Sequence, residues 1–222
     1  MLKNLILGTL LFTLISVHAQ QANQFNSDRG MMIFTKEKEP DAFTGSPYYE
    51  DDFILGVIHD DQGRSLNVML RYNALEDVVV IKPNTSQQED EFMLPKLKTI
   101  TYELDDYTYF IDNLKTDNGN IEAYFAKFYE GKKSLFIGQP KVDLTPPQKA
   151  KTGYEKDKPA NINVKMVYYL SIDGGMLMET RLKEKDLKDF FKSDKMKDYF
   201  NSKKINTEND VIELLKYYEN NG

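Results

Sequence analysis

Two groups of acidic residues next to tyrosines are the features of this sequence best suited to chemistry. One group follows the pair Tyr48 and Tyr49, and the other stands between two tyrosine-containing segments. The acids are Glu50, Asp51 and Asp52 in the first group and Glu103, Asp105 and Asp106 in the second. Glycosidic bond hydrolysis requires a pair of carboxyl groups at a set distance. A carboxylate-dependent glycan hydrolase or a glycan-binding protein is therefore one hypothesis.

Histidine and cysteine usage sets the strongest limit on other kinds of catalysis. The chain has no cysteine, and of its two histidines His18 falls in the leader described below, which leaves His59. A serine or threonine nucleophile needs a base to activate it, and a zinc site needs several histidine or cysteine ligands. His59 stands beside Asp60 at a predicted strand end, a position typical of a solvated turn residue. We therefore predict no catalytic residue, no metal site and no cofactor.

A third feature is the triplet Arg71, Tyr72 and Asn73 at the end of a predicted strand. Alternation places Arg71 on the opposite face of that strand from Tyr72. Its guanidinium then either pairs with an acid such as Glu76 or Asp77 and fixes a hairpin, or anchors a ligand. Together with the aromatic pair, the triplet gives the candidate ligand-binding residues Tyr48, Tyr49, Arg71, Tyr72 and Asn73.

The first 19 residues have the three parts of a secretory signal peptide. Lys3 supplies the positive charge, residues 5–17 are uncharged and mostly apolar, and small residues stand at Val17 and Ala19. A membrane-spanning helix needs about 20 apolar residues, and this run is too short. We predict cleavage after Ala19, export to the periplasm or the outside of the cell, and no transmembrane segment in the mature chain.

Composition narrows the class of partner. The formal net charge is −6, and only four residues are arginine. Arginine forks carry many phosphate and guanine contacts, so this balance argues against nucleic-acid binding. An exported chain without cysteine has no disulfide framework. Its 13 phenylalanines and 14 tyrosines must therefore supply the stability through packing.

Strand patterns joined by short turns fill the chain from about residue 52 to 137. Residues 66–72 alternate between apolar and polar side chains, which indicates a half-buried strand. Turn-forming clusters at residues 60–63 and 117–120 each contain a glycine. Further predicted strands lie at 53–58, 78–81, 99–102, 107–111, 123–129 and 134–137. Strands at this spacing predict an antiparallel meander.

Residues 139–163 break this pattern. They contain four prolines, many lysines and few apolar side chains. We predict a long exposed loop, extended rather than helical, which is either an insertion between strands or a binding flap. Residues 164–172 and 176–182 then form a closing hairpin across a turn at Gly174 and Gly175.

From residue 183 onward the apolar period becomes helical. Ser193 is a predicted N-cap, and Thr207 with Asp210 fits a capping box with aspartate in place of glutamate. The apolar faces that follow the caps are Met196, Tyr199 and Phe200, and then Val211, Leu214, Leu215 and Tyr218. We expect these faces to dock on the sheet or on each other.

The patterns together predict an α+β protein. Residues 1–19 form the signal peptide, 20–182 an antiparallel β-domain, and 183–222 a helical segment packed on it. The β-domain is a curved antiparallel meander of about eight to ten strands, followed by about two or three short helices. A barrel-like, a half-open and a sandwich arrangement all remain open.

A spaced motif adds a resemblance. Residues 45–48 read Gly-Ser-Pro-Tyr, Phe53 and Gly56 follow, and residues 70–73 read Leu-Arg-Tyr-Asn. With the Pro/Lys-rich stretch and the Lys-rich helical tail, this motif resembles uncharacterised exported proteins of the Bacteroidetes. The resemblance implies a Gram-negative envelope setting and a β-domain, and it brings no activity, substrate or catalytic residue.

The leading hypothesis for function is a non-enzymatic binding or interaction protein of the cell envelope. Its partner would be another envelope protein, a lipid or a glycan. A large apolar cavity would favour a carrier of an apolar ligand. A groove with paired carboxyls beside Tyr48 or Tyr49 would favour the glycan hydrolase. A filled core with an exposed apolar patch would favour a protein partner.

Overall fold

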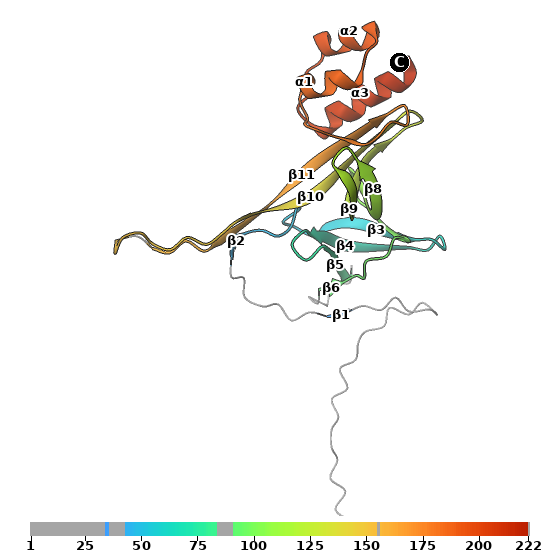
Figure 1. Cartoon of the computed structure of the whole chain (residues 1–222). Helices are drawn as coiled ribbons and strands as arrows, with labels where there is room; N and C mark the ends of the chain where they lie inside the picture. The colour runs from blue at the N-terminus through green and yellow to red at the C-terminus, as the bar shows by residue number, and fades with distance from the viewer. Residues whose placement is uncertain (1–33, 36–42, 84–90, 155, 222) are drawn as a thin grey trace, which may run out of the picture. The chain divides into compact units, whose positions relative to one another are not determined.

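The backbone of this chain is organised as one large sheet with helices after its last strand (Figure 1). The structure, a computed structural model, describes residues 34–35, 43–83, 91–154 and 156–221. These residues belong to one compact unit, Met32–Gly222. The predicted signal peptide and the polar segment after it lie outside the described residues.

Twelve strands form in the described part of the chain. They are β1 Phe34–Thr35, β2 Phe43–Gly45, β3 Ile54–Asp60, β4 Ser65–Asn73, β5 Val78–Pro83, β6 Phe92–Met93, β7 Ile100–Glu103, β8 Thr108–Thr116, β9 Gly119–Glu130, β10 Ser134–Thr145, β11 Ala160–Ile172 and β12 Met178–Thr180. Four helical segments follow: α1 Glu184–Leu187, the 3-10 turn η1 Lys188–Phe190, α2 Asp194–Ser202 and α3 Glu208–Asn221.

The strand order confirms the predicted meander and α+β class. It runs β1-β6-β5-β4-β3-β7-β8-β9-β10-β11-β12, with antiparallel neighbours throughout, while β2 pairs in parallel with β11. This path has β1 and β12 at its two ends, so the sheet is open within the described residues. The strand count exceeds the prediction because β1, β2 and β6 are only two or three residues long. Such short strands form by pairing with distant partners and have little local signal.

Local sequence explains the longer strands. Alternating residues Val68, Leu70 and Tyr72 of β4 are buried, as a strand with one face on a core requires. The turn before β4 contains Gly63 at φ 76°, a backbone conformation that glycine adopts without steric cost. The predicted hairpin at 117–120 joins β8 to β9, with Thr116 opposite Gly119.

The prediction of a loop over residues 139–163 was wrong at both ends. β10 and β11 pair without a register shift from Ser134 opposite Ile172 to Thr145 opposite Asn161, so the connection spans only 146–159. The Asp173 N–H donates to the Lys133 carbonyl. Along β10 the backbone N–H and C=O groups of every second residue, counted from Lys133, point toward β11. Pro140 belongs to the other set, so its nitrogen points away from β11. A proline is tolerated there because no ladder bond needs its missing N–H.

Both faces of β10 and β11 are covered along the part of the two strands nearest the helices. Phe136 and Leu170 pack with the apolar side chains of the helices. The next residues along each strand, Ile137 and Tyr169, face the opposite side and pack with Phe125. Successive side chains of a strand point to opposite faces, so this region is buried in two layers.

The C-terminal helices form as predicted. The Ser193 hydroxyl accepts the Met196 N–H at the start of α2. At α3, the Asp210 N–H donates to the Thr207 hydroxyl at 3.2 Å and the Thr207 N–H donates to the Asp210 carboxylate at 3.0 Å. This reciprocal pair is a capping box, and it satisfies backbone donors that a helix start leaves open.

The helices among the described residues all lie between Glu184 and Asn221. None of the helices in that part of the chain combines the length and the apolar character that a membrane span requires.

Gly56 of β3 gives a direct test of core packing. A Cβ atom at this position would lie 2.7 Å from the Glu103 carbonyl oxygen and 2.9 Å from a Leu70 methyl group. The carbonyl belongs to the neighbouring strand and cannot move freely. We expect Gly56→Ala to lower the free energy of unfolding by about 1–3 kcal/mol in urea denaturation. Gly153→Ala is the matched control, because nothing lies within 4 Å of its Cβ position. Equal stabilities of the two variants would contradict this packing.

Candidate functional site

The segment 46–53, which we call the strap, links distant parts of the sheet. The Ser46 N–H donates to the Ile162 carbonyl at 3.1 Å, and the Ala74 N–H donates to the Pro47 carbonyl at 2.8 Å. Tyr48 forms an antiparallel bridge with Asn73. The strap therefore joins β11 to the end of β4, and it brings part of the predicted ligand site together.

Arg71 is enclosed by the strap rather than presented to solvent. Its guanidinium carbon lies 3.6 Å from the centre of the Tyr48 ring and 4.2 Å from that of Phe53. Nη1 donates to the Asp51 carbonyl at 3.0 Å, and Nη2 pairs with the Glu91 carboxylate at 3.4 Å. The side chain is only 15% exposed. These contacts are those of a residue that fixes a loop.

The acidic partner of Arg71 is Glu91, whereas the sequence suggested an acid such as Glu76 or Asp77. Those acids lie in the turn directly after β4, where the Asn73 side chain accepts the Glu76 N–H and the Tyr72 hydroxyl donates to Asp77. Arg71 points to the other face, as the alternation predicted. Its acidic partner comes instead from the residue before β6, through a pairing that the sequence does not indicate.

Tyr72 lies in a buried layer of tyrosine rings, so it cannot contact a ligand at the surface. Its ring centre is 5.3 Å from those of Tyr109 and Tyr124, and the Tyr124 ring is 6.2 Å from Tyr102. Burial raises the pKa of Tyr124 to about 12. Within the described residues, the hydroxyls of Tyr102 and Tyr124 are buried without a hydrogen-bond partner.

A carboxyl–tyrosine cluster forms beside this layer. The Tyr109 hydroxyl donates to the Glu50 carboxylate at 3.2 Å. Burial is the main cause that raises the pKa of Glu50 to about 7, while its backbone and Tyr109 hydrogen bonds oppose the rise. Tyr49 is half-buried near Glu208, and Tyr168 donates its hydroxyl to that same acid. The cluster thus connects the strap to the first residue of α3.

A carboxyl that titrates near neutral pH is suited to acid–base chemistry. A glycosidase also needs a second carboxyl in the same groove. The second predicted acidic group does not supply it. Tyr102 pairs with Tyr109 and shares its face, so the adjacent Glu103 side chain lies on the other face of the sheet. The two predicted acidic groups are therefore not assembled into one site.

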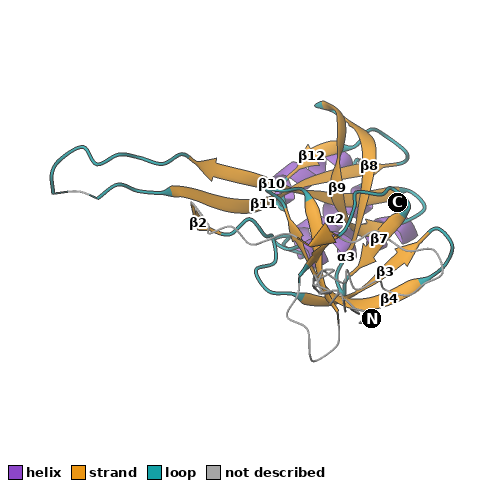
Figure 2. Ribbon diagram, turned by 90° about the horizontal axis from the view of Figure 1, so that it is seen from below, coloured by secondary structure: helices purple, strands orange, loops and turns teal. Residues whose placement is uncertain are grey.

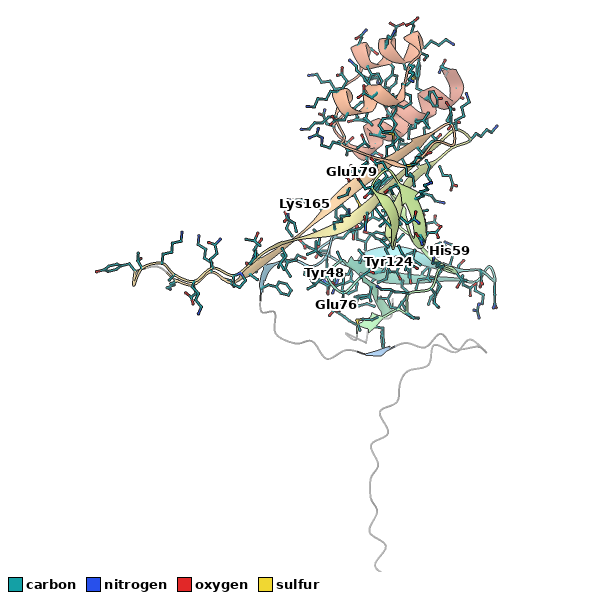
Figure 3. All side chains as sticks on the ribbon, viewed as in Figure 1. Tyr48, His59, Glu76, Tyr124, Lys165 and Glu179 are labelled. Carbon is teal, nitrogen blue, oxygen red and sulfur yellow. The ribbon has the colours of Figure 1, made fainter. Side chains whose placement is uncertain are left out.

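A hydrogen-bonded chain of Ser65, His59 and Glu103 is the arrangement that sequence reasoning missed. Its central residue, His59, is labelled in Figure 3. His59 Nδ1 lies 2.9 Å from the Ser65 hydroxyl, and Nε2 lies 2.7 Å from the Glu103 carboxylate. The order matches a nucleophile, a base and an orienting acid. The cross-strand register places His59 opposite Ser65. The turn at residues 61–63 predicts this pairing, because His59 and Ser65 stand at equal distances on either side of it.

These three side chains stand on an open sheet face. The His59 side chain is 37% exposed and that of Glu103 is 59% exposed. A nucleophile also needs donors that stabilise the developing oxyanion and a site that excludes water. Cross-strand polar pairs on a solvated sheet stabilise the strand register. We therefore interpret the hydrogen bonds of Ser65, His59 and Glu103 as surface contacts that stabilise the strand register. This interpretation agrees with the prediction of a solvated His59.

Comparisons with known proteins give no relative. The chain matches no protein-family model, no curated protein and no solved structure. The function has to be inferred from the residues themselves.

Replacing Arg71 by lysine tests whether its guanidinium group holds the strap in place. Lysine keeps the charge but loses the planar group that lies between the rings of Tyr48 and Phe53. We expect R71K to lower the free energy of unfolding by about 1–3 kcal/mol. R64K is the control, because Arg64 pairs with Asp60 in an exposed turn and such pairs contribute about 0–1 kcal/mol. A ligand-anchoring role alone would leave both variants equally stable.

Glu50 predicts a pH dependence of folding. Burial favours the protonated carboxyl, so its folded pKa of about 7 lies above the reference value of 4.5. The stability from this group is full below pH 4.5 and is lost as the pH rises through about 7. Between pH 4.5 and about 7, we expect the free energy of unfolding of the unmutated protein to fall by about 2 kcal/mol relative to that of E50Q. Urea denaturation at a series of pH values measures this difference. Parallel pH profiles for the two proteins would contradict this environment.

Proposed function

We propose that this chain is a non-enzymatic interaction protein of the cell envelope that binds a protein partner through the β10–β11 ribbon. The observation that carries the proposal is the extension of this ribbon beyond β9, its neighbour on the β10 side (Figure 2). We define the arm as residues 139–165. It comprises the outer parts of both strands and their connection.

The arm presents an open strand edge. β10 pairs with β9 only as far as Gly138 but with β11 as far as Thr145. By the alternation described above, the N–H and C=O groups of Val142 and Leu144 point away from β11. No described strand pairs with them. Such an edge can receive one extended segment of a partner by strand addition.

Exposed side chains and charge support a protein partner. Leu144 is 54% exposed on β10, and Tyr154 is fully exposed in the connection. The arm contains six lysines and three acidic residues, in a chain whose formal net charge is −6. A basic arm on an acidic protein favours an acidic partner surface, because complementary charge steers association.

The interior argues for an interaction protein over a carrier. The Tyr and Phe side chains expected to line a ligand cavity pack on each other instead, with Tyr102, Tyr109, Tyr124 and Phe125 completely buried. A close-packed interior of this kind has its aromatic area already in contact. The glycan alternative has no comparable support, since the Tyr48 ring is covered by Arg71.

The envelope setting rests on the predicted signal peptide and the family resemblance. Residues 1–19 lie outside the described part of the chain. Periplasmic or extracellular location is therefore part of the proposal.

Photo-crosslinking tests the proposed function. A photoreactive phenylalanine analogue at Leu144 should crosslink an envelope protein in living cells, because this side chain lies on the open edge. The same analogue at Leu97, which is 42% exposed outside the arm, is the matched control. A second variant, V142P/L144P, removes the two outward N–H groups that strand addition needs, and like Pro140 neither proline removes a ladder bond to β11. We expect it to fold and to lose the co-purifying protein in native mass spectrometry.

Two outcomes would overturn the proposal. One is an equal crosslinking yield at Leu97 and Leu144. The other is a protein partner that the V142P/L144P variant retains in full.

A further inference from the structure

The two faces of the arm differ in polarity. Residues that pair across β10 and β11 point to the same face of the ribbon, and successive residues of a strand point to opposite faces. One face is apolar and consists of the pairs Pro140–Met166, Val142–Val164 and Leu144–Ile162. The other face is polar and consists of the pairs Lys141–Lys165, Asp143–Asn163 and Thr145–Asn161. A strand added to the ribbon would extend both faces at once.

The apolar face is covered at its β11 edge and open at its β10 edge. β2 pairs with β11, with Gly45 opposite Ile162, and the Ile162 residue is only 3% exposed. Leu144, directly across the ribbon from Ile162, is 54% exposed, and Val142 is partly exposed. Among the described residues, no strand pairs with the outer edge of β10 beyond Gly138. Leu144 therefore lacks the neighbouring strand that Ile162 has.

The polar side chains of the other face already have partners within the protein. Asp143 pairs with Lys165, and the Lys141 ammonium donates to the Tyr169 hydroxyl at 3.4 Å. All three charged residues are exposed. Because both signs of charge stand on this face, it offers a ligand no single sign of charge to recognise. The apolar face is therefore the one that can select a partner by the area it buries.

Prolines limit the open edge to a short stretch. Val142 and Leu144 supply its outward N–H groups. Pro140 precedes this stretch, and two further prolines at 146 and 147 follow it. Proline has no N–H to donate, so an added strand finds backbone donors only opposite residues 141–145. The same prolines oppose a long ladder with another chain, which is the usual hazard of an exposed edge.

Building on the proposed strand addition, we propose that the open edge of the arm selects a short extended protein segment with apolar side chains at alternate positions. The segment residues opposite Val142 and Leu144 lie on the apolar face and cover these two side chains, because directly opposed residues of neighbouring strands share a face. The residue between them lies on the polar face, opposite Asp143, and is polar. The partner is thus recognised by an apolar–polar–apolar pattern together with its backbone.

The alternation decides which segments fit. Side chains of a strand repeat every two residues, so two adjacent apolar residues point to opposite faces. One of them would lie on the face of Lys141 and Asp143, and only the other would cover the apolar face. An alternating segment places both on the apolar face and removes more apolar area from water.

NMR titration of the mature chain with two peptides tests this pattern. The probes are acetyl-Ser-Val-Thr-Val-Ser-amide and acetyl-Ser-Val-Val-Thr-Ser-amide, which share one composition and differ only in order. We expect the alternating peptide to bind about fivefold or more tightly than the other. The amide proton shifts of Val142 and Leu144 should exceed that of Asp143, whose N–H points toward β11. Equal affinities, or no binding of the alternating peptide, would refute the pattern.

Matched threonine variants separate the two faces. V142T/L144T keeps both outward N–H groups and makes the apolar face polar, so we expect it to weaken binding of the alternating peptide by about fivefold or more. K141T/D143T is the control, because it changes two side chains of the polar face and leaves the net charge unchanged. It should bind the alternating peptide as tightly as the unmutated chain does. Equal losses in the two double variants would show that the apolar face has no special part in binding.

Co-purification from cells separates this inference from the proposed function. Loss of the protein partner in both V142P/L144P and V142T/L144T supports the apolar pattern. A partner that the proline variant loses and V142T/L144T retains in full leaves strand addition standing and refutes the pattern. A partner that both variants retain refutes the proposed function as well. A dimer of the unmutated chain in sedimentation that V142P/L144P abolishes would identify a second copy as the occupant, against a partner segment.

Discussion

The burial of tyrosine hydroxyls is the constraint on which the arrangement of this sheet depends. The tyrosines of the buried layer are at most 3% exposed, and a buried hydroxyl without a partner costs about 1–3 kcal/mol. Loops supply partners for two of these hydroxyls, whereas the hydroxyls of Tyr102 and Tyr124 have none among the described residues. Asp77 accepts from Tyr72 and stands at φ 55°, while Glu50 accepts from Tyr109 and is held in a buried site that disfavours its charge. A strained turn and a perturbed carboxyl are thus both consequences of satisfying this layer.

The strap and the C-terminal helices are attached to the sheet by different kinds of contact. On one side the strap is held by Arg71, which connects rings, a carbonyl and a carboxylate through a single side chain. On the other side the helices cover β10 and β11 mainly through an apolar cluster around Phe136 and Leu170. Polar contacts therefore specify the path of the chain, and apolar contacts supply most of the buried area. The arm extends beyond these contacts on its β10 edge, while β2 and the strap hold its β11 edge at residues 160–162.

Local pattern predicted what depends on neighbours in sequence. The alternation in β4, the hairpin at Gly119 and the capping box of α3 were all confirmed, because each is decided within a few residues. Contacts between distant residues were not predictable in the same way. The partner of Arg71 stands 20 residues away, and the Ser65, His59 and Glu103 chain requires the strand order. Pro140 was misleading, because its tolerance in β10 depends on which way one backbone nitrogen points.

The two-stranded ribbon also determines how a pull on the arm would reach the body of the protein. Twelve residue pairs join β10 to β11, and a load applied at the connection draws both strands in the same direction. The ladder is then not unzipped one bond at a time. The tension passes along both backbones to the region where β9 holds β10 and where β2 and β12 hold β11. The arm would therefore act as a tether that loads several inter-strand ladders in shear.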